Sequence, residues 1–385
     1  MKRILRILTI ALAAVCMFIL TVSAGLAEST TPVYSAEDLF TDRDLEQTAD
    51  RTDAVFLTVA DGQDITITEA GVYVLSGTAS GVTVRVEAGE DDKVQLVLDG
   101  LSVTNTSFPV IYVKSADKVF VTVAADSSLA VTGAFTSDGD TKTDSVVFSK
   151  TDLTLNGTAA LTISSSDNGV VSKDDLKVTG GTWIIRAASK ALEANDSIRI
   201  AGGTLNLTAG TDGLHAENDD DPSEGFIYIG GGSLTISAGD DAIHATTVVQ
   251  IDGGSISAVA AEGIEGTYIQ LNGGTISIQA SDDGINAARK SSAYTPVVEI
   301  NGGDITIAMG AGDTDGIDSN GNIIMNGGTV NVTGNSTFDY DGTAQYNGGT
   351  IIANGQQVSE IPNQMMGGQG GWGGQGGGRG GKRGW

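Results

Sequence analysis

The stretch TYIQLNGGTISIQASDDGINA, residues 267–287, contains one complete unit of a repeating pattern. TYIQLN alternates polar and apolar residues, GTISIQA alternates again after the glycines, and the polar SDDG precedes a short INA. Alternation with a period of two is typical of a β-strand with one buried face. Glycine, asparagine and aspartate tolerate the backbone conformations that tight corners require. The stretch therefore predicts three short strands and three corners in about twenty residues.

The unit recurs along the second half of the chain. Examples are VTGGTWII (178–185), IAGGTLNL (200–207), IDGGSISA (251–258), INGGDITI (300–307) and MNGGTVNV (325–332). The spacing of about 20–29 residues is typical of a solenoid and is shorter than a propeller blade. We therefore predict an all-β fold, a parallel β-helix solenoid with about 20–29 residues per coil.

The first residues have the pattern of a secretory leader. Lys2, Arg3 and Arg6 precede an apolar run from residue 7 to residue 22, which ends in SAGLA before Glu28. This predicts a signal peptide at 1–27, cleaved after Ala27. The run is short for a membrane span, so an uncleaved anchor is the less favoured alternative. We expect a secreted, extracellular protein with no stable membrane span after cleavage, and leave association with the cell surface open.

Three further regions follow the leader. Residues 28–63 are predicted to be an N-terminal linker and cap, because Ser35 and Asp38 have the spacing of a capping pair and a solenoid needs its open end covered. Residues 64–360 are predicted to form the β-helix, and 361–385 a disordered glycine-rich tail. Residues 64–155 repeat less regularly and fit either the first coils, which we favour, or a separate sandwich.

Charge excludes one class of partner. The chain has 21 basic and 48 acidic residues, a net charge of −27. No basic surface is available to neutralise phosphates, so we expect no nucleic acid as partner. The one cysteine, Cys16, lies in the leader, so the mature chain is predicted to have neither disulfides nor thiolate metal ligands.

Acidic residues recur at one corner of the predicted coils. Aligning the short sequence segments predicted at this corner places Asp212, Asp241, Glu262, Asp283 and Asp315 in one column. Asn168 begins this column and Lys190 interrupts it. Neighbouring coils lie about 4.8 Å apart, and two unit charges at that distance repel by roughly 1 kcal/mol in water and by several at a partly buried site. Between residue 199 and the tail only Arg289 and Lys290 are basic. We therefore predict Ca²⁺, a cation that accepts six to eight oxygens.

Three groups are candidate calcium ligands. The first is DTDGIDSN, with Asp313, Asp315 and Asp318, which has the alternate aspartates of a calcium loop but lacks the final glutamate of an EF-hand. The second pairs Asp240 and Asp241 with Asp282 and Asp283, and the third is Asp339 with Asp341. The alternative is that each corner is a turn whose carboxylate faces solvent.

Two histidines occupy equivalent positions. His215 and His244 each precede alanine, and stacked imidazoles resemble a transition-metal pair. Because Glu265, Asn286 and Asp318 fill the same column further on, we favour a mixed polar ladder.

Two coils carry insertions, ENDDDPSEG (217–225) and ARKSSAYTP (288–296). Insertions at one corner of a solenoid emerge on one side, which is usually the binding face. We predict that Tyr294 and Tyr228 stack on sugar rings while Asp219 and Asp220 bind hydroxyls. Phe226 and Trp183 lie in segments that alternate apolar and polar residues, and both are predicted to be core residues. Tyr228 also lies in such a segment, so Tyr294 is the stronger candidate for stacking on a sugar ring.

The words EAGVYVLSG, VTVRVEA and VQLVLDGLSV, followed by NGGTI and DDGINA, resemble a family of secreted bacterial carbohydrate-binding domains over about residues 60–355. The resemblance implies a right-handed parallel β-helix with a pectate-lyase-like fold. It also implies calcium along the helix and recognition of cellulose and acidic, pectin-like polymers, without established catalysis.

We therefore expect a monomeric, non-catalytic, calcium-assisted protein whose partner is a cell-wall polysaccharide. The first alternative is a calcium-dependent pectate lyase, which needs a base from Lys290, Arg289, Lys190 or Lys173. The second is a structural surface or adhesin protein.

Overall fold

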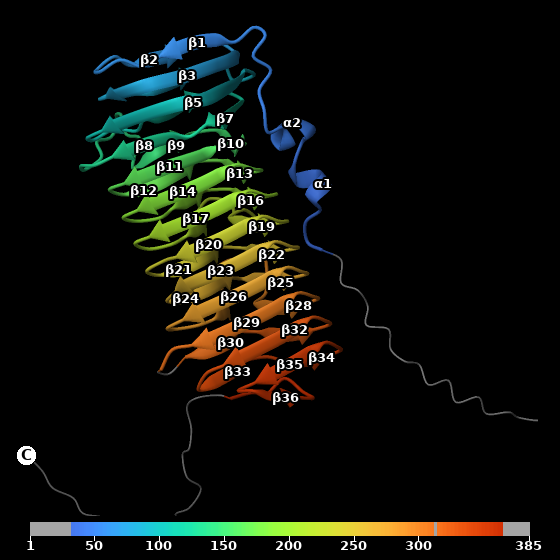
Figure 1. Cartoon of the computed structure of the whole chain (residues 1–385). Helices are drawn as coiled ribbons and strands as arrows, with labels where there is room; N and C mark the ends of the chain where they lie inside the picture. The colour runs from blue at the N-terminus through green and yellow to red at the C-terminus, as the bar shows by residue number, and fades with distance from the viewer. Residues whose placement is uncertain (1–31, 312–313, 365–385) are drawn as a thin grey trace, which may run out of the picture.

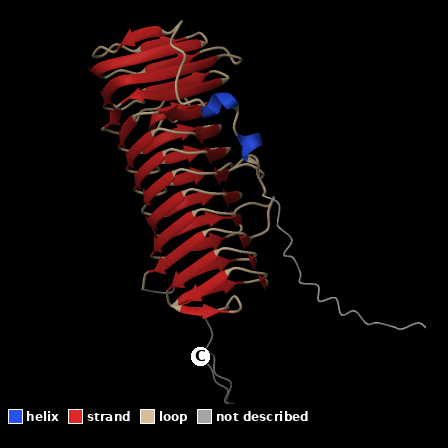
Figure 2. Ribbon diagram, turned by 45° about the vertical axis from the view of Figure 1, so that its right-hand side comes forward, coloured by secondary structure: helices blue, strands red, loops and turns tan. Residues whose placement is uncertain are grey.

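The computed structural model describes residues 32–311 and 314–364. Within them the chain forms 36 strands and two short helices. The strands lie in one sheet of 24 and one of 12 strands. The strands pair in parallel, except that β35 and β36 pair antiparallel, and Figures 1 and 2 show them as a stack of coils. The predicted leader at 1–27 and the tail after Gln364 lie outside the described residues.

Three rows of strands run along the stack. The larger sheet opens with the short strand β1 (Val55–Thr58) and the long strands β3 (Gly71–Ser80) and β5 (Lys93–Asn105), and then divides into two rows. The first row is β7 (Lys118–Ala125), β10 (Asp152–Gly157), β13 (Asp175–Val178), β16 (Ser197–Ile200), β19 (Phe226–Ile229), β22 (Val248–Ile251), β25 (Tyr268–Leu271), β28 (Val297–Ile300), β31 (Asn322–Met325) and β34 (Ala344–Tyr346). The second row is β8 (Ser127–Val131), β11 (Ala160–Ser165), β14 (Thr182–Ala187), β17 (Thr204–Ala209), β20 (Ser233–Ser237), β23 (Ser255–Ala260), β26 (Thr275–Ala280), β29 (Asp304–Met309), β32 (Thr329–Thr333) and β35 (Thr350–Ala353), with β36 (Gln356–Val358) at its end.

The smaller sheet is the third row. It consists of β2 (Ile65–Ile67), β4 (Val84–Glu87), β6 (Ile111–Ser115), β9 (Ser145–Ser149), β12 (Asn168–Ser172), β15 (Leu192–Ala194), β18 (Leu214–Ala216), β21 (Asp241–Ala245), β24 (Glu262–Gly266), β27 (Ile285–Ala287), β30 (Asp315–Ser319) and β33 (Ser336–Tyr340). From β7 to β33 each coil gives one strand to each row. The architecture is all-β and consistent with a parallel β-helix; its handedness stays a prediction.

The register agrees with the predicted spacing. Ile198 pairs with Ile227 and Val249 pairs with Ile269, offsets of 29 and 20 residues. The strands between residues 64 and 155 belong to the same two sheets as the later ones. That region therefore forms the first coils of the stack and is not a separate sandwich.

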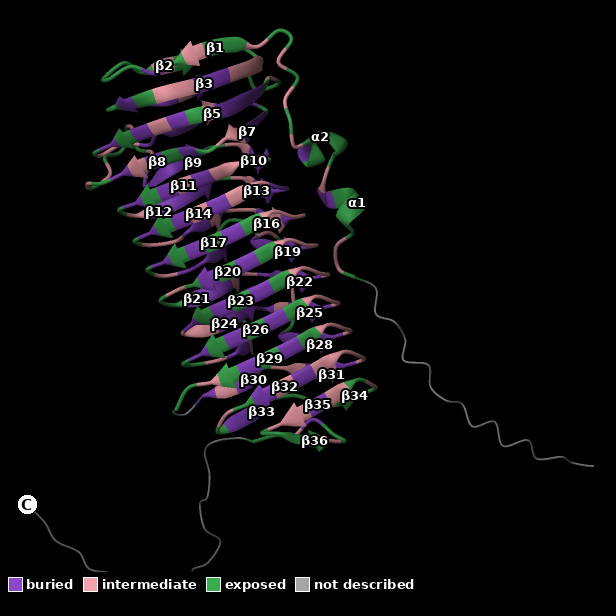
Figure 3. Cartoon of the chain, viewed as in Figure 1, coloured by how far each residue is buried: buried purple, intermediate pink, exposed green. Residues whose placement is uncertain are grey.

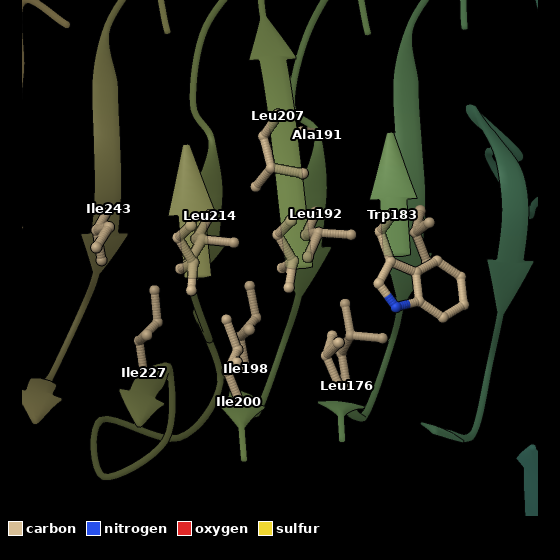
Figure 4. Packing of buried hydrophobic residues seen from close by; sticks show 14 of the residues in the cluster. Leu176, Trp183, Ala191, Leu192, Ile198, Ile200, Leu207, Leu214, Ile227 and Ile243 are labelled. Atoms are coloured by element: carbon tan, nitrogen blue, oxygen red, sulfur yellow. The ribbon is translucent and has the colours of Figure 1, made fainter. Parts of the chain in front are cut away.

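The core lies inside the stack because one side of each strand is apolar. Leu205 and Leu207 are 0% and 2% exposed, whereas the alternating Thr204 and Asn206 are exposed. Figure 4 shows such residues of successive coils side by side, and Figure 3 shows the alternation of buried and exposed positions. Trp183 is buried and donates its Nε1–H to the Gly180 carbonyl at 2.7 Å, so its predicted place in the core is confirmed.

The NGG corners are held by a ladder of asparagine amides. Asn301 Nδ2 donates to Asn272 Oδ1 at 2.8 Å, and Asn326 Nδ2 donates to Asn301 Oδ1 at 2.7 Å. Gly274 has φ of 89°, and a Cβ there would lie 2.9 Å from the carbonyl oxygen of Gly254 in the coil before. The recurring NGG is therefore structural.

The N-terminal segment lies along the side of the stack, so the predicted cap over the open end is wrong. We call residues 32–54 the strap; it contains α1 (Ala36–Leu39) and α2 (Asp42–Leu45), beside the first row in Figure 1. Tyr34 exchanges two backbone hydrogen bonds with the Gln250 amide, at 2.7 and 2.9 Å, and its ring stacks on Phe226 at 4.2 Å. Ser35 precedes α1 but makes no side-chain cap; the capping box is at Thr41 and Asp44.

A buried ion cluster fixes the strap. Asp44 is fully buried, and its carboxylate lies 2.6 Å from Lys118 Nζ and 3.3 Å from Lys177 Nζ. Burial alone would raise the pKa of Asp44, but the hydrogen bond and charge of Lys118 and the charge of Lys177 hold the pKa well below its usual range. Asp44 therefore fixes the strap to strands β7 and β13 of the first row.

The far end of the stack extends slightly beyond the predicted domain boundary at residue 360. Ile361 is buried, and the Gln364 side chain accepts a hydrogen bond from the Thr337 backbone at 2.7 Å. No helix in the described ranges is long and apolar enough to cross a membrane.

Candidate functional site

Two columns of polar side chains follow the third row. The acidic column consists of Asp212, Asp241, Glu262, Asp283 and Asp315; the mixed ladder consists of Glu193, His215, His244, Glu265, Asn286, Asp318 and Asp339. The mixed ladder is continuous in the strand register from β15 to β33. In the acidic column Asp241 pairs with Glu262, and backbone hydrogen bonds connect the other coils at the same level. The coiling of the chain therefore brings acidic residues that are far apart in sequence into one column.

The two columns lie three residues apart on each coil, so each corner acid faces a ladder residue. His244 Nδ1 lies 2.7 Å from Asp241 Oδ2 and 2.8 Å from Glu265 Oε2. His215 Nδ1 lies 2.9 Å from Asp212 Oδ2, and the two imidazole rings stack at 4.6 Å. The predicted pairing of the histidines in one ladder is thus observed.

This half of the face is an ion-pair network. Burial lowers the pKa of His244, but hydrogen bonds and charge from Asp241 and Glu265 outweigh it and raise the pKa to about 9. Lys290 Nζ lies 2.8 Å from the other oxygen of Glu265. The ligand atoms of Asp241, His244 and Glu265 lie within 4.8 Å of one another, as a metal site would need. With the His244 imidazolium between two carboxylates, the trio forms a buried ion-pair cluster.

The other half of the face is not compensated in this way. Burial and the Glu265 carboxylate raise the pKa of Glu262 to about 8. Burial, with a contribution from Asp282, raises the pKa of Asp283 to about 6. Burial, with the charges of Asp283 and Asp315, raises the pKa of Asp318 to about 7. In all three groups burial is the main cause of the raised pKa, and repulsion from neighbouring carboxylates adds to it.

The chemistry of this acidic half fits a hard cation. Within the described part of the chain, no ion pair joins Asp283 or Asp318 to a basic side chain. Asp283 Oδ1 accepts the backbone N–H of Asp315 at 3.1 Å, which brings these two corners together. Asp283, Asp315 and Asp318 are thus the residues that would hold Ca²⁺, which binds carboxylate and carbonyl oxygens.

The remaining predicted ligands are dispersed. Asp240 and Asp282 are exposed, one position before the acidic column, and the coil of Glu262 separates them. The predicted grouping of Asp240 and Asp241 with Asp282 and Asp283 therefore does not form one compact site. Asp313 lies outside the described residues.

The predicted sugar-stacking role of Tyr228 is wrong for this structure. Tyr228 is 2% exposed, and its hydroxyl lies 3.0 Å from Asp252 Oδ2. It packs with Phe226 in an apolar cluster beneath the strap. Phe226 is buried, as predicted, but on the outer side of the sheet. The sequence could not show this because alternation tells which residues share a face, not what covers that face.

Tyr294 and the two insertions are close together. The Ser291 hydroxyl of one insertion donates to the Pro222 carbonyl of the other at 2.5 Å. Tyr294 is half-buried, 6.3 Å from the Tyr268 ring. Asp219 and Asp220 are exposed and line a polar cavity of about 530 Å³ that His215 also lines. The insertions therefore border the mixed ladder, as expected of loops on one side of a solenoid.

A spacing in the sequence indicates the ion pairs of the mixed ladder. Each corner acid precedes a ladder residue by three positions, as in DGLHA, DAIHA, EGIEG and DGIDS. Extending that spacing to every coil predicts the ion pairs of His215 and His244. The pairing of Lys290 with Glu265 has no such signal, because the lysine comes from an insertion.

Comparison with known proteins agrees with this geometry. A family model described as "Carbohydrate-binding domain-containing protein" matches residues 61–313 and 264–358. The chain belongs to this carbohydrate-binding domain family.

Two relatives are similar over part of their length or of this chain. A carbohydrate-binding domain-containing protein of Acetivibrio thermocellus is 36% identical over 130 residues, which are 32% of this chain and 46% of the relative. The chain thus matches less than half of that relative. A solved structure described as the polysaccharide lyase-like protein from C. thermocellum, gadolinium derivative, is 30% identical with a TM-score of 0.52. That match covers 56% of this chain and 96% of the other.

Proposed function

We propose that this family member is a secreted, non-catalytic protein that binds plant cell-wall polysaccharides with the help of Ca²⁺. The family match supports carbohydrate binding. The leader pattern of residues 1–27 supports secretion. The parallel three-row stack and the lyase-like structural neighbour support a right-handed parallel β-helix.

The observation that carries the proposal is the column of partly buried carboxylates at Glu262, Asp283 and Asp318, whose pKa values are raised. Neighbouring charges about 5 Å apart repel by roughly 1 kcal/mol in water and by more where they are partly buried. A divalent cation converts this repulsion into attraction. The solved neighbour is described as a gadolinium derivative, and Gd³⁺ is also a hard cation that prefers oxygen ligands.

Calcium also gives a strongly acidic protein a way to hold an acidic polymer. With a net charge of −27, the chain repels polyuronates on its own. A Ca²⁺ ion bound by Asp283 and Asp318 would have further coordination positions, which sugar carboxylates and hydroxyls would fill. We therefore propose acidic, pectin-like glycans as ligands of the third-row face, and cellulose as a further ligand of the protein.

The test is a pull-down on polygalacturonate in Ca²⁺ and in EDTA. The wild-type protein is expected to bind in Ca²⁺ and to lose at least tenfold in affinity in EDTA. The double variant Asp283→Asn with Asp318→Asn is expected to bind weakly in both conditions. Asp140→Asn, at an exposed position in the loop before β9 and several coils before Glu262, is the matched control and is expected to behave as wild type. Equal binding of the wild type with and without EDTA would refute calcium bridging.

A polysaccharide lyase is the second candidate, because the solved neighbour is described as polysaccharide lyase-like. β-Elimination needs a base within reach of the substrate. Burial lowers the pKa of Lys290, but the Glu265 hydrogen bond and charge outweigh it and raise the pKa, so this lysine is a poor base. Arg289, Lys173 and Lys190 remain, and the Nζ atoms of the two lysines lie 3.4 and 3.6 Å from the Glu193 carboxylate. Growth of ultraviolet absorbance on polygalacturonate, lost in Lys190→Ala, would establish the enzyme.

A further inference from the structure

One face of this strongly acidic protein is almost free of charge. Six neighbouring strands of the second row, β17, β20, β23, β26, β29 and β32, each direct three side chains outward. Most of these residues are serine or threonine, and in this described patch Asp304 is the only charged one. Elsewhere the molecule carries a large excess of acid. The absence of charge over six coils is therefore a property of this face, which we call the hydroxyl face.

A groove runs along the edge of the hydroxyl face, where β20, β23, β26 and β29 end. It has a volume of about 520 Å³, and none of its lining residues is charged. Val259, which is 50% exposed, lies in it together with Ala308 and Met309 and provides an apolar lining. Gln279 and Ser281 supply amide and hydroxyl groups in the same groove. Asp240 and Asp282, although close in sequence, do not line it.

We propose that this groove binds a strand of an uncharged polysaccharide. The inference rests on the proposed function of polysaccharide binding and adds a second site, separate from the acidic third-row face. The occupant is neutral because none of the residues that line the groove has a charge with which to recognise a carboxylate, sulfate or phosphate. A second copy of the chain is disfavoured as occupant, because it would bring its own large negative charge to the contact.

The chemistry of the groove suits a sugar chain. Sugar rings have apolar C–H faces, which gain from contact with Val259, Ala308 and Met309. Their hydroxyls would bind Gln279 and Ser281 and the rim of serine and threonine side chains. These short side chains lose little conformational entropy when they are fixed by a ligand. The groove crosses four coils spaced by about 4.8 Å, so it accommodates a chain of several sugar units parallel to the stack.

The test introduces a charged side chain into the groove. Val259→Lys places an ammonium on its wall, and Thr208→Lys, at the equivalent outward position of β17 and outside the groove, is the matched control. Binding is measured to microcrystalline cellulose and to an uncharged xylan, each in EDTA. The wild type and Thr208→Lys are expected to bind one or both, and Val259→Lys is expected to bind at least tenfold more weakly. Polygalacturonate binding in Ca²⁺ is expected to be the same in all three proteins.

The outcomes separate this inference from the proposed function. If the wild type holds polygalacturonate but neither neutral polymer, the neutral site is refuted and the acidic site stands. If Val259→Lys binds the neutral polymers like the wild type, the groove is not the site. If Val259→Lys loses both classes of polymer while melting like the wild type, the two sites are not separate and the inference is overturned. If calcium bridging fails but neutral binding depends on Val259, the groove stands alone.

Discussion

Single carboxyl groups report the electrostatic state of the third-row face. Glu262, Asp283 and Asp318 have raised pKa values of about 8, 6 and 7. A raised carboxyl pKa means that the folded protein holds a proton that the unfolded chain has released. Stability falls with increasing pH wherever the folded state binds more protons. His244 acts in the same direction, because its pKa of about 9 is above that of a free imidazole.

The metal-free protein is therefore expected to be less stable at alkaline pH. We expect the free energy of unfolding in EDTA to fall between pH 5 and pH 8 by on the order of 2 kcal/mol, since one pKa unit corresponds to about 1.4 kcal/mol and solvent screening reduces the full value. Asp318→Asn is expected to flatten this dependence, and Asp140→Asn to leave it unchanged. Urea unfolding across the pH range measures it; a flat or rising wild-type profile would contradict the assigned pKa shifts.

At the scale of elements, the strap depends on one buried aspartate. Asp44→Ala would leave the ammonium groups of Lys118 and Lys177 in a buried place without their partner, and breaking such a pair costs about 3–5 kcal/mol. We expect faster proteolysis within residues 32–54 and a lower melting temperature. Asp42→Ala, at an exposed position of the same helix, is the control. If Asp44→Ala is cleaved no faster than Asp42→Ala, the ion cluster does not hold the strap.

For the whole molecule, the stacked-strand architecture could be predicted from the sequence because each coil repeats the same local pattern. Leu205 and Leu207 alternate with polar residues, and Gly274 occurs where only glycine fits, so short windows specify strands and corners. The acidic column was predictable for the same reason, because equivalent residues of repeated segments lie above one another when the coils stack.

The strap and the covered aromatic surface could not be predicted in this way. Asp44 meets Lys118 and Lys177 across more than seventy residues, and no periodic pattern connects them. Tyr228 alternates like a surface residue and is buried only because the strap lies over it. The neutral groove could not be predicted either. It is defined by the absence of charged residues at positions that only the strand register brings together.

The most direct test of the stacked-carboxylate account is the melting temperature at pH 8 in EDTA and with increasing Ca²⁺. Binding to the folded state alone stabilises it by about 2.7 kcal/mol at a ligand concentration of 100 Kd, which corresponds to a rise of several degrees for a chain of this size. We expect that rise in the wild type and its loss in the Asp283→Asn, Asp318→Asn double variant. The same melting temperature in EDTA and in saturating Ca²⁺ would contradict the claim that these carboxylates bind a cation.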